Sequence, residues 1–204
     1  MAALVVTLTT VVALVAGAAP ASAGQPAPAT ARYETRFMTQ MVDHHGMAVQ
    51  MAQLCTHQAV HVDLVDLCQE IIAAQRTEIA QMQRWLQDWY GVRHAPQMSA
   101  ADMRQMQRLQ RLSGADFEVA FLQMMTRHHR LAIVRAQGCL DRARHEALRE
   151  MCQDIVTAQR AEIAQMQRWL CDWYGRCGRG DHGGAQGATG GAQGHHGGAQ
   201  RQHG

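Results

Sequence analysis

The sequence lacks the features by which several functional classes are recognised. Its net charge is only +2, and its 19 basic residues, all arginines, are interspersed with acidic ones. It has no basic stripe interleaved with aromatic residues, which argues against a nucleic-acid-binding protein. No glutamate has a histidine three residues after it, so the Glu-x-x-His spacing of di-iron oxidases is missing. We also find no nucleophile–base arrangement and therefore do not expect an enzyme.

The two ends of the chain are predicted to lie outside its folded part. Residues 4–18 form an apolar run that is short for a membrane span, and small residues up to Ala23 resemble a cleavage site. We expect a signal peptide over 1–23, leaving no stable membrane span after cleavage, and a flexible segment over 24–32. A single membrane anchor is the alternative. Residues 178–204, rich in Gly, Ala, Gln and His, are predicted to be a disordered tail because they have little to bury.

The folded part, residues 33–177, contains an internal duplication. Residues 37–91 and 121–175 align without a gap at an offset of 84, and 30 of 55 positions are identical. Each repeat has two stretches with apolar residues at helical spacing, and no stretch is a convincing strand. We predict helices over 35–56, 62–90, 115–140 and 145–174. Two helical hairpins of this kind are typical of an all-α, four-helix, ferritin-like bundle.

Local signals mark where these helices begin and end. Gly91 and Gly175 follow the last periodic residues, where a C-terminal glycine is favoured. Ser99 and Ser113 each precede an aspartate by three residues, a spacing that predicts capping boxes. These two serines bracket a short predicted connecting helix over 100–112.

A helical wheel places polar residues among apolar ones in both repeats. His44 and His45 fall inside the apolar arc of their helix, whereas Asp43 and Gly46 fall on the side expected to face water. A glutamate within an apolar stripe, such as Glu78, is seldom tolerated unless it is paired or binds a metal. The set expected to meet in the interior consists of His44, His45, His128, His129, Glu78 and Glu162, with Met41, Met82, Met125 and Met166 close by.

Two interpretations of this polar set stay open. The histidines and glutamates could form a buried hydrogen-bonded network, which is viable if every member is satisfied. They could instead bind a transition metal, and thioether sulfur would shift the preference toward copper. Methionine is also a common core filler. Met47 is replaced by Leu131 in the second repeat, which argues against its being required in both halves.

Six cysteines are expected to form three disulfides in an exported protein. Each hairpin holds one cysteine at either side of its turn, and two more flank the end of the last helix. The predicted pairs are Cys55–Cys68, Cys139–Cys152 and Cys171–Cys177. A zinc site that uses Cys55 with His57 and His61 is the alternative, although Asp141 stands in place of His57 in the second repeat.

The paired FxxxMxxHH and EIAQMQRWL segments resemble the secreted bacterial family known as domain of unknown function 305. The resemblance covers about residues 33–175 and implies a ferritin-like fold, with the motif histidines at His44, His45, His128 and His129. Some relatives are associated with periplasmic copper binding. We therefore expect a periplasmic or extracellular protein that sequesters or transfers copper or another transition metal. The histidines of the tail could bind metal loosely, or the tail could be only a soluble extension. A structural or interaction module and a metal-dependent redox enzyme are the alternatives.

Overall fold

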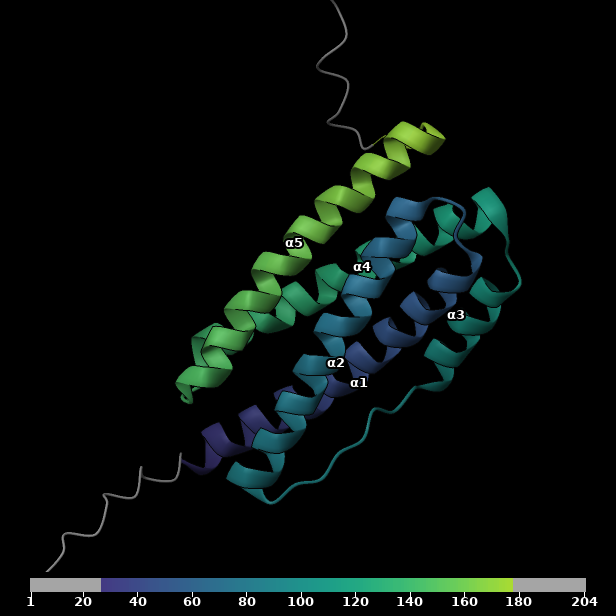
Figure 1. Cartoon of the computed structure of the whole chain (residues 1–204). Coiled ribbons are helices and arrows are strands. Elements are labelled where there is room, and N and C mark those ends of the chain that lie inside the picture. Colours follow the sequence, from purple (N-terminus) through teal and green to yellow (C-terminus); the bar gives the residue numbers. More distant parts are fainter. Residues whose placement is uncertain (1–26, 178–204) are drawn as a thin grey trace, which may run out of the picture.

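The computed structural model describes residues 27–177, and this part of the chain is entirely helical apart from its connections, as Figure 1 shows. Its elements are α1 (Pro28–Gln58), α2 (Val62–Tyr90), α3 (Ala100–Gln110), α4 (Gly114–Arg142) and α5 (Glu146–Tyr174). The predicted all-α fold class is confirmed. None of these helices is long and apolar enough to cross a membrane. The predicted signal peptide and tail lie outside the described residues.

The helix ends follow the sequence signals at most positions. Gly91 and Gly175 both adopt left-handed backbone conformations, with φ of 66° and 62°, and end α2 and α5 as predicted. The Ser99 capping box at the start of α3 is confirmed. The one predicted at Ser113 is wrong, because its side chain makes no capping hydrogen bond. Gly114, which follows it, has a φ of 55° and turns the chain away from the usual cap geometry.

Helix α1 begins earlier than the sequence predicts. Residues 28–32, expected to belong to a flexible segment, already form its first turns. Pro28 suits the first position of a helix, because its fixed φ is already helical and the missing N–H has no partner there. This turn is also anchored by packing, since Tyr33 stacks on Phe37 and Glu34 is fully buried. The prediction missed this contribution because it comes from contacts with distant parts of the chain.

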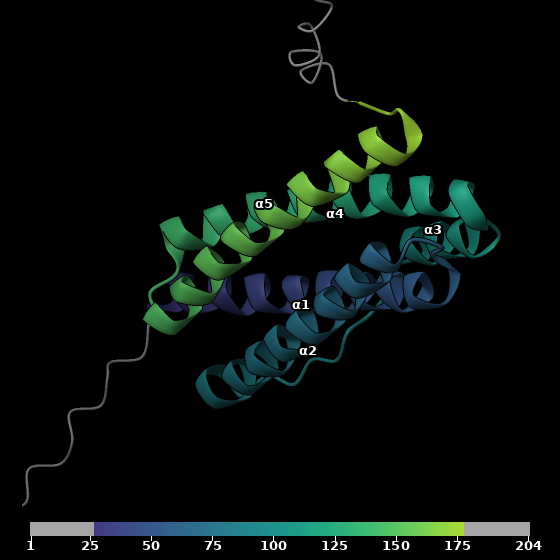
Figure 2. The same ribbon diagram turned by 45° about the horizontal axis from the view of Figure 1, so that its top comes forward.

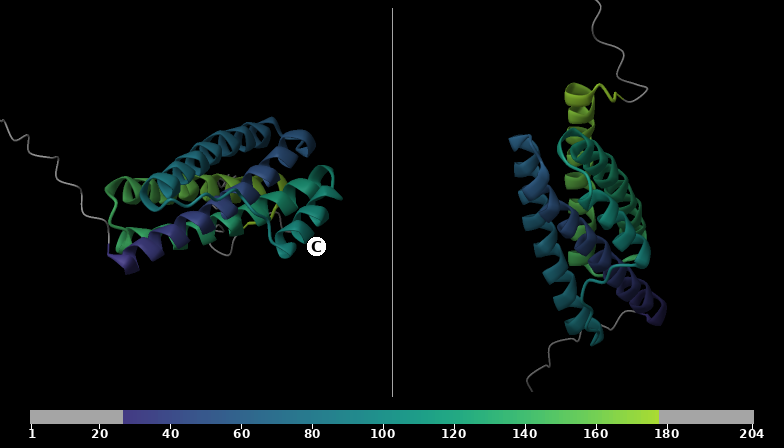
Figure 3. Two further views of the ribbon diagram at one scale, coloured as in Figure 1. Left: turned by 90° about the horizontal axis from the view of Figure 1, so that it is seen from below. Right: turned by 90° about the vertical axis from the view of Figure 1, so that its right-hand side faces the viewer.

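Two antiparallel hairpins make up the bundle. Helix α1 packs against α2, α4 packs against α5, and the hairpins meet mainly where α1 lies against α4. The turned views show the hairpins as separate pairs, with α1 and α4 running in opposite directions (Figure 2 and Figure 3). All six cysteines lie at disulfide-bonding distance in the predicted pairs. The zinc alternative at Cys55 therefore fails, because both thiols of that hairpin are joined to each other.

The apolar interior is divided into two clusters. One is built around Met47, Met51, Leu64, Phe117, Phe121, Met125 and Met166, and the other around Phe37, Met41, Met82, Leu86, Ala132, Leu148 and Ile155. The offset of 84 residues relates the two clusters: Phe37 in one corresponds to Phe121 in the other. The duplication thus produces a bundle with approximate twofold symmetry, and each hairpin contributes to both clusters.

One connection breaks this symmetry. Residues 91–99, which we call the strap, run from the end of α2 to the start of α3 without regular structure (Figure 1). Asp43 of α1 holds the strap through one oxygen, which accepts hydrogen bonds from His94 Nε2 at 2.7 Å and from the Gln97 amide at 2.8 Å. A Cβ added at Gly46 would lie 2.5 Å from the Cβ of Pro96. The expectation that Gly46 faces water is therefore wrong, because the strap covers it, and Asp43 is only partly exposed.

Candidate metal centre

Four histidines form a row between the two hydrophobic clusters. His44 and His45 come from α1, and His128 and His129 come from α4. The rings of His44 and His128 lie against each other across the α1–α4 contact, with their centroids 3.6 Å apart. Within each helix the paired rings are 6.0 Å and 6.4 Å apart. The duplication therefore brings both histidine pairs together at the approximate symmetry axis, as the sequence predicts.

A glutamate lies at each end of this row. The carboxylate of Glu78 on α2 is 2.7 Å from His45 Nε2, and that of Glu162 on α5 is 2.6 Å from His129 Nε2. These contacts are close, but the ring N–H directions do not meet the geometry of a hydrogen bond. Both glutamates are about one-fifth exposed. The row thus reads Glu–His–His–His–His–Glu from α2 to α5.

Most ring nitrogens in this row have no hydrogen-bond partner. Five buried ring nitrogens have neither a hydrogen-bond nor an ion-pair partner: both of His44 and the Nδ1 atoms of the other three histidines. The buried Gln75 and Gln159 side chains, one turn from the two glutamates, each leave an oxygen unsatisfied as well. Buried polar groups are nearly always hydrogen-bonded, and each exception calls for an explanation. A ligand that takes the ring lone pairs would supply one.

The environment keeps the central histidines neutral. Burial, reinforced by the neighbouring His129, His45 and Arg135, lowers the pKa of His128 to about 3. Burial, reinforced by His128 and His45, also holds the pKa of His44 far below its usual 6.5. A neutral imidazole keeps a lone pair for a metal, whereas a protonated one does not. Both rings are therefore in the protonation state that a metal site requires.

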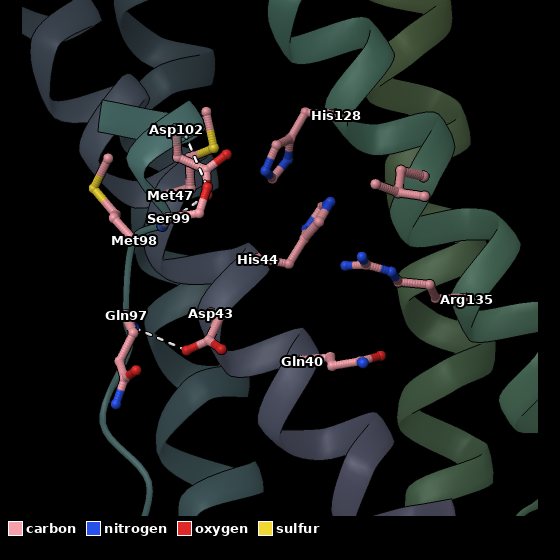
Figure 4. Close-up of a pocket in the computed structure, with 11 residues that line it drawn as sticks. Gln40, Asp43, His44, Met47, Gln97, Met98, Ser99, Asp102, His128 and Arg135 are labelled. Carbon is pink, nitrogen blue, oxygen red and sulfur yellow. Dashed lines mark hydrogen bonds between the residues drawn. The ribbon is translucent and has the colours of Figure 1, made fainter. Parts of the chain in front are cut away.

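A pocket of about 420 Å³ opens on the His44–His128 contact (Figure 4). In Figure 4 these two rings lie at its centre and point toward each other, with the strap on one side and Arg135 on the other. The remaining lining residues are Gln40, Asp43, Met47, Gln97, Met98, Ser99, Asp102 and Leu131. The two central histidines are thus reachable from solvent through this opening.

The four predicted interior methionines are fully buried but do not gather around the histidines as one group. Met41 and Met82 belong to one hydrophobic cluster, and Met125 and Met166 belong to the other. Within residues 27–177, no three His, Cys, Asp or Glu side chains converge in a way that could hold a metal ion. A metal at the histidine row would therefore need other donors or a movement of side chains.

Two further polar clusters join the hairpins at opposite ends of the bundle. In the Glu34 cluster, the fully buried Glu34 accepts hydrogen bonds from Tyr90, from the amides of Arg144 and His145, and from His145 Nδ1 at 2.6 Å. The Trp89 ring stacks on His145, with centroids 3.8 Å apart. The carboxylate therefore links the end of α2 to the start of α5.

The second of these, the Glu118 cluster, repeats the arrangement at the other end. Glu118 accepts from Tyr174, from the amides of Val60 and His61, and from His61 Nδ1 at 2.6 Å. Trp173 stacks on His61 as Trp89 stacks on His145. Neither glutamate was predicted from the sequence to have a role, and His61 was considered only for a zinc site. They could have been found, because Glu34 and Glu118 also differ by 84 positions and extend the repeat toward the N-terminus.

The pKa shifts of the two buried glutamates predict an acid-sensitive fold. Burial alone would raise the pKa of Glu34 and of Glu118, but the hydrogen bonds that each carboxylate accepts outweigh burial and hold both below the usual 4.5. A carboxylate with a depressed pKa in the fold contributes stability above its unfolded-state pKa, and this contribution is lost as the pH falls through the folded value.

We expect the free energy of unfolding to drop as the pH falls below about 4.5. Urea unfolding of the Glu34→Gln/Glu118→Gln variant should show a flatter profile there, and an unchanged slope would contradict this assignment.

The comparisons with known proteins agree with this architecture. A family model described as domain of unknown function (DUF305) matches residues 34–170. CopM, solved with Cu(I), Cu(II) and silver bound, superposes in its Cu(I) form with a TM-score of 0.62 and 28% identity, covering 69% of this chain and 97% of CopM.

Two other solved structures carry the same family name. A candidate secreted protein from Streptomyces coelicolor has a TM-score of 0.60 and 26% identity, covering 68% of this chain and 92% of its own. A fragment from Deinococcus radiodurans has a TM-score of 0.61 and 28% identity, covering 68% and 95%. No curated protein matches this chain. The family match over most of the chain shows that this protein belongs to the DUF305 family.

Proposed function

We propose that this protein is an exported copper-binding protein that sequesters or transfers the metal through its interior histidines. The observation that carries the proposal is the set of five buried ring nitrogens in the histidine row that have neither a hydrogen-bond nor an ion-pair partner. Leaving a buried polar group unpaired costs about 1–3 kcal/mol. A row of such groups is difficult to explain as a stabilising network, whereas metal ions would use the lone pairs directly.

The donor chemistry favours copper among the common metals. Imidazole suits copper, nickel, iron and zinc, and thioether sulfur favours Cu(I) over the harder ions. Both donor types line the pocket at the His44–His128 contact. CopM, which shares the fold and the family, has been solved with Cu(I), Cu(II) and silver bound. This likeness supports the same class of metal here.

Export is part of the proposal. Three cysteine pairs lie at disulfide distance, and disulfides persist mainly in oxidising compartments such as the periplasm. The Streptomyces relative carries a name that describes a candidate secreted protein. Together with the predicted signal peptide, these observations support a periplasmic or extracellular location.

Copper stoichiometry of paired histidine variants tests the proposed function. We expect the His44→Ala/His45→Ala variant and the His128→Ala/His129→Ala variant each to lose tight copper binding, because both pairs contribute to one row. The control is the chain lacking residues 178–204, which should keep the tight site. Unchanged copper binding in both histidine variants would contradict the proposal. Loss of copper binding only when residues 178–204 are removed would mean that the site lies in the tail.

A second candidate function has one observation in its favour. The close contacts of Glu78 with His45 and of Glu162 with His129 are what a purely structural polar core would contain. A structural or interaction module of that kind would have a melting temperature that ignores added copper. A copper-binding protein is stabilised in proportion to the logarithm of the free metal concentration above its dissociation constant. Melting curves with and without copper therefore separate the two functions.

A further inference from the structure

The pocket at the histidine row is not symmetric, although the histidines are. On the strap side it is lined by Met47 of α1 and by Met98 of the strap. The position equivalent to Met47 in the second repeat is Leu131, which lines the same pocket and is 47% exposed. The strap has no counterpart among the described residues of the second repeat, since Cys177 is joined back to Cys171. Both thioethers therefore lie on one side of the His44–His128 pair.

We propose that this pocket is a single site for a soft monovalent metal ion, with His44 and His128 as nitrogen donors and Met47 and Met98 as sulfur donors. This inference rests on the proposed function and specifies it: one ion per bundle, bound on the strap side, rather than one ion per repeat. Methionine has three rotatable bonds, so its sulfur can move toward a metal without a shift of the backbone.

The two carboxylates of the pocket each have one oxygen engaged in hydrogen bonds. One Asp43 oxygen accepts two hydrogen bonds from the strap, and Asp102 accepts from Ser99 in the capping box of α3. Arg135 adds a positive charge that lowers the pKa of both central histidines. The same charge opposes a divalent ion more strongly than a monovalent one. The pocket also offers imidazole and thioether groups, which favour Cu(I) or Ag(I) over Zn(II).

The strap determines where Met98 lies. It is fastened to α1 by the Asp43 hydrogen bonds and to α2 by Gln83, whose side chain donates to the His94 carbonyl at 2.8 Å. Its close approach to α1 depends on Gly46, which leaves room for Pro96. The second repeat has Arg127 and Arg130 in place of Asp43 and Gly46, so it could not hold a strap in this way. The strap thus places Met98 at the pocket, and the described residues of the second repeat contain no equivalent segment.

Titration of the full chain with Ag(I), and with Cu(I) under reducing conditions, tests this site. We expect the Met47→Leu/Met98→Leu variant to bind both ions more weakly by about tenfold or more, the range that loss of even a supporting group produces. X-ray absorption of wild-type protein with one equivalent of Cu(I) should show copper–sulfur scattering that this variant loses. The matched control is Met41→Leu/Met125→Leu, which exchanges two buried methionines outside the pocket and should bind as wild type does. Leucine is close to methionine in volume, so both variants should fold.

The outcomes separate this inference from the proposed function. If the Met47/Met98 variant binds like wild type while His44→Ala/His128→Ala does not, the sulfur assignment is wrong and the histidine site stands. If the Met41/Met125 control is the variant that weakens binding, the donors are the interior methionines and the inference fails. If none of the three variants changes binding, both proposals fail.

The Gly46→Ala variant tests the role of the strap. It should displace the strap and weaken Ag(I) binding while the pocket methionines are retained. Unaltered Ag(I) binding would contradict the idea that the strap places Met98 at the site.

Discussion

Replacing Glu34 with alanine is expected to lower the free energy of unfolding by about 3–5 kcal/mol, because several donors would each lose an acceptor at a cost of about 1–3 kcal/mol. Glu34 is fully buried, and its carboxylate accepts from Tyr90 and from two amides at the turn between α4 and α5. Alanine would leave these donors without acceptors. It would also remove the link between the two hairpins at that end. Chemical denaturation monitored by circular dichroism measures the effect.

Two other substitutions make this prediction specific. Glu118→Ala should destabilise the fold by a similar amount, because the Glu118 cluster repeats the Glu34 cluster contact for contact. Glu70→Ala removes an exposed glutamate from the surface of α2 and should change stability by less than about 0.5 kcal/mol. If Glu34→Ala resembled Glu70→Ala, the cluster would not be a stabilising link between the hairpins.

The second large expected effect is an increase in the stability of the metal-free protein. Replacing His44 and His128 together with leucine is expected to raise the stability of the metal-free protein by about 2–4 kcal/mol, because each unsatisfied buried polar group costs about 1–3 kcal/mol. Three ring nitrogens of this pair lack a partner in the structure. The same variant should lose tight copper binding. Stability and metal binding would then respond in opposite directions to one change, as expected when a site is maintained for its ligand.

This experiment also separates the metal site from a structural network. In a satisfied network the two imidazoles would contribute stability, so the leucine variant would unfold more easily than wild type. Thermal and urea unfolding should be measured with a chelator present, so that residual copper does not stabilise the wild-type protein. His57→Leu, at the exposed end of α1, is a suitable control and should be nearly neutral.

Much of the fold could be predicted from the sequence, because the relevant signals are local. The apolar periodicity identifies the four long helices, and Gly91 and Gly175 end two of them where the left-handed conformation is needed. The wheel also places His44 and His45 correctly in the interior. These predictions depend only on neighbouring residues along one helix. The early start of α1 could not be predicted in this way, because Glu34 is buried by residues near 90 and 145.

The sequence predicted that the four histidines face inward, but it predicted neither their arrangement nor the methionines of the pocket. The wheel shows which residues face inward, but it does not show that α1 and α4 run antiparallel and bring His44 onto His128. For the same reason it could not show that Met41 and Met125 lie in different clusters. Asp43 and Gly46 were assigned to solvent because a strap without regular structure has no periodic signal. The asymmetry of the pocket follows from that strap, and only a three-dimensional structure shows it.

The most direct test of the central claim is the copper content of the full-length protein, recovered from the exported fraction of cells grown with copper and compared with the His44→Ala/His128→Ala variant. We predict at least one tightly held copper per wild-type chain, resistant to dialysis against a weak chelator, and none at that site in the variant. Wild-type protein that is recovered folded but without copper, or a variant that retains the same copper content, would contradict the assignment of the histidine row as a metal centre.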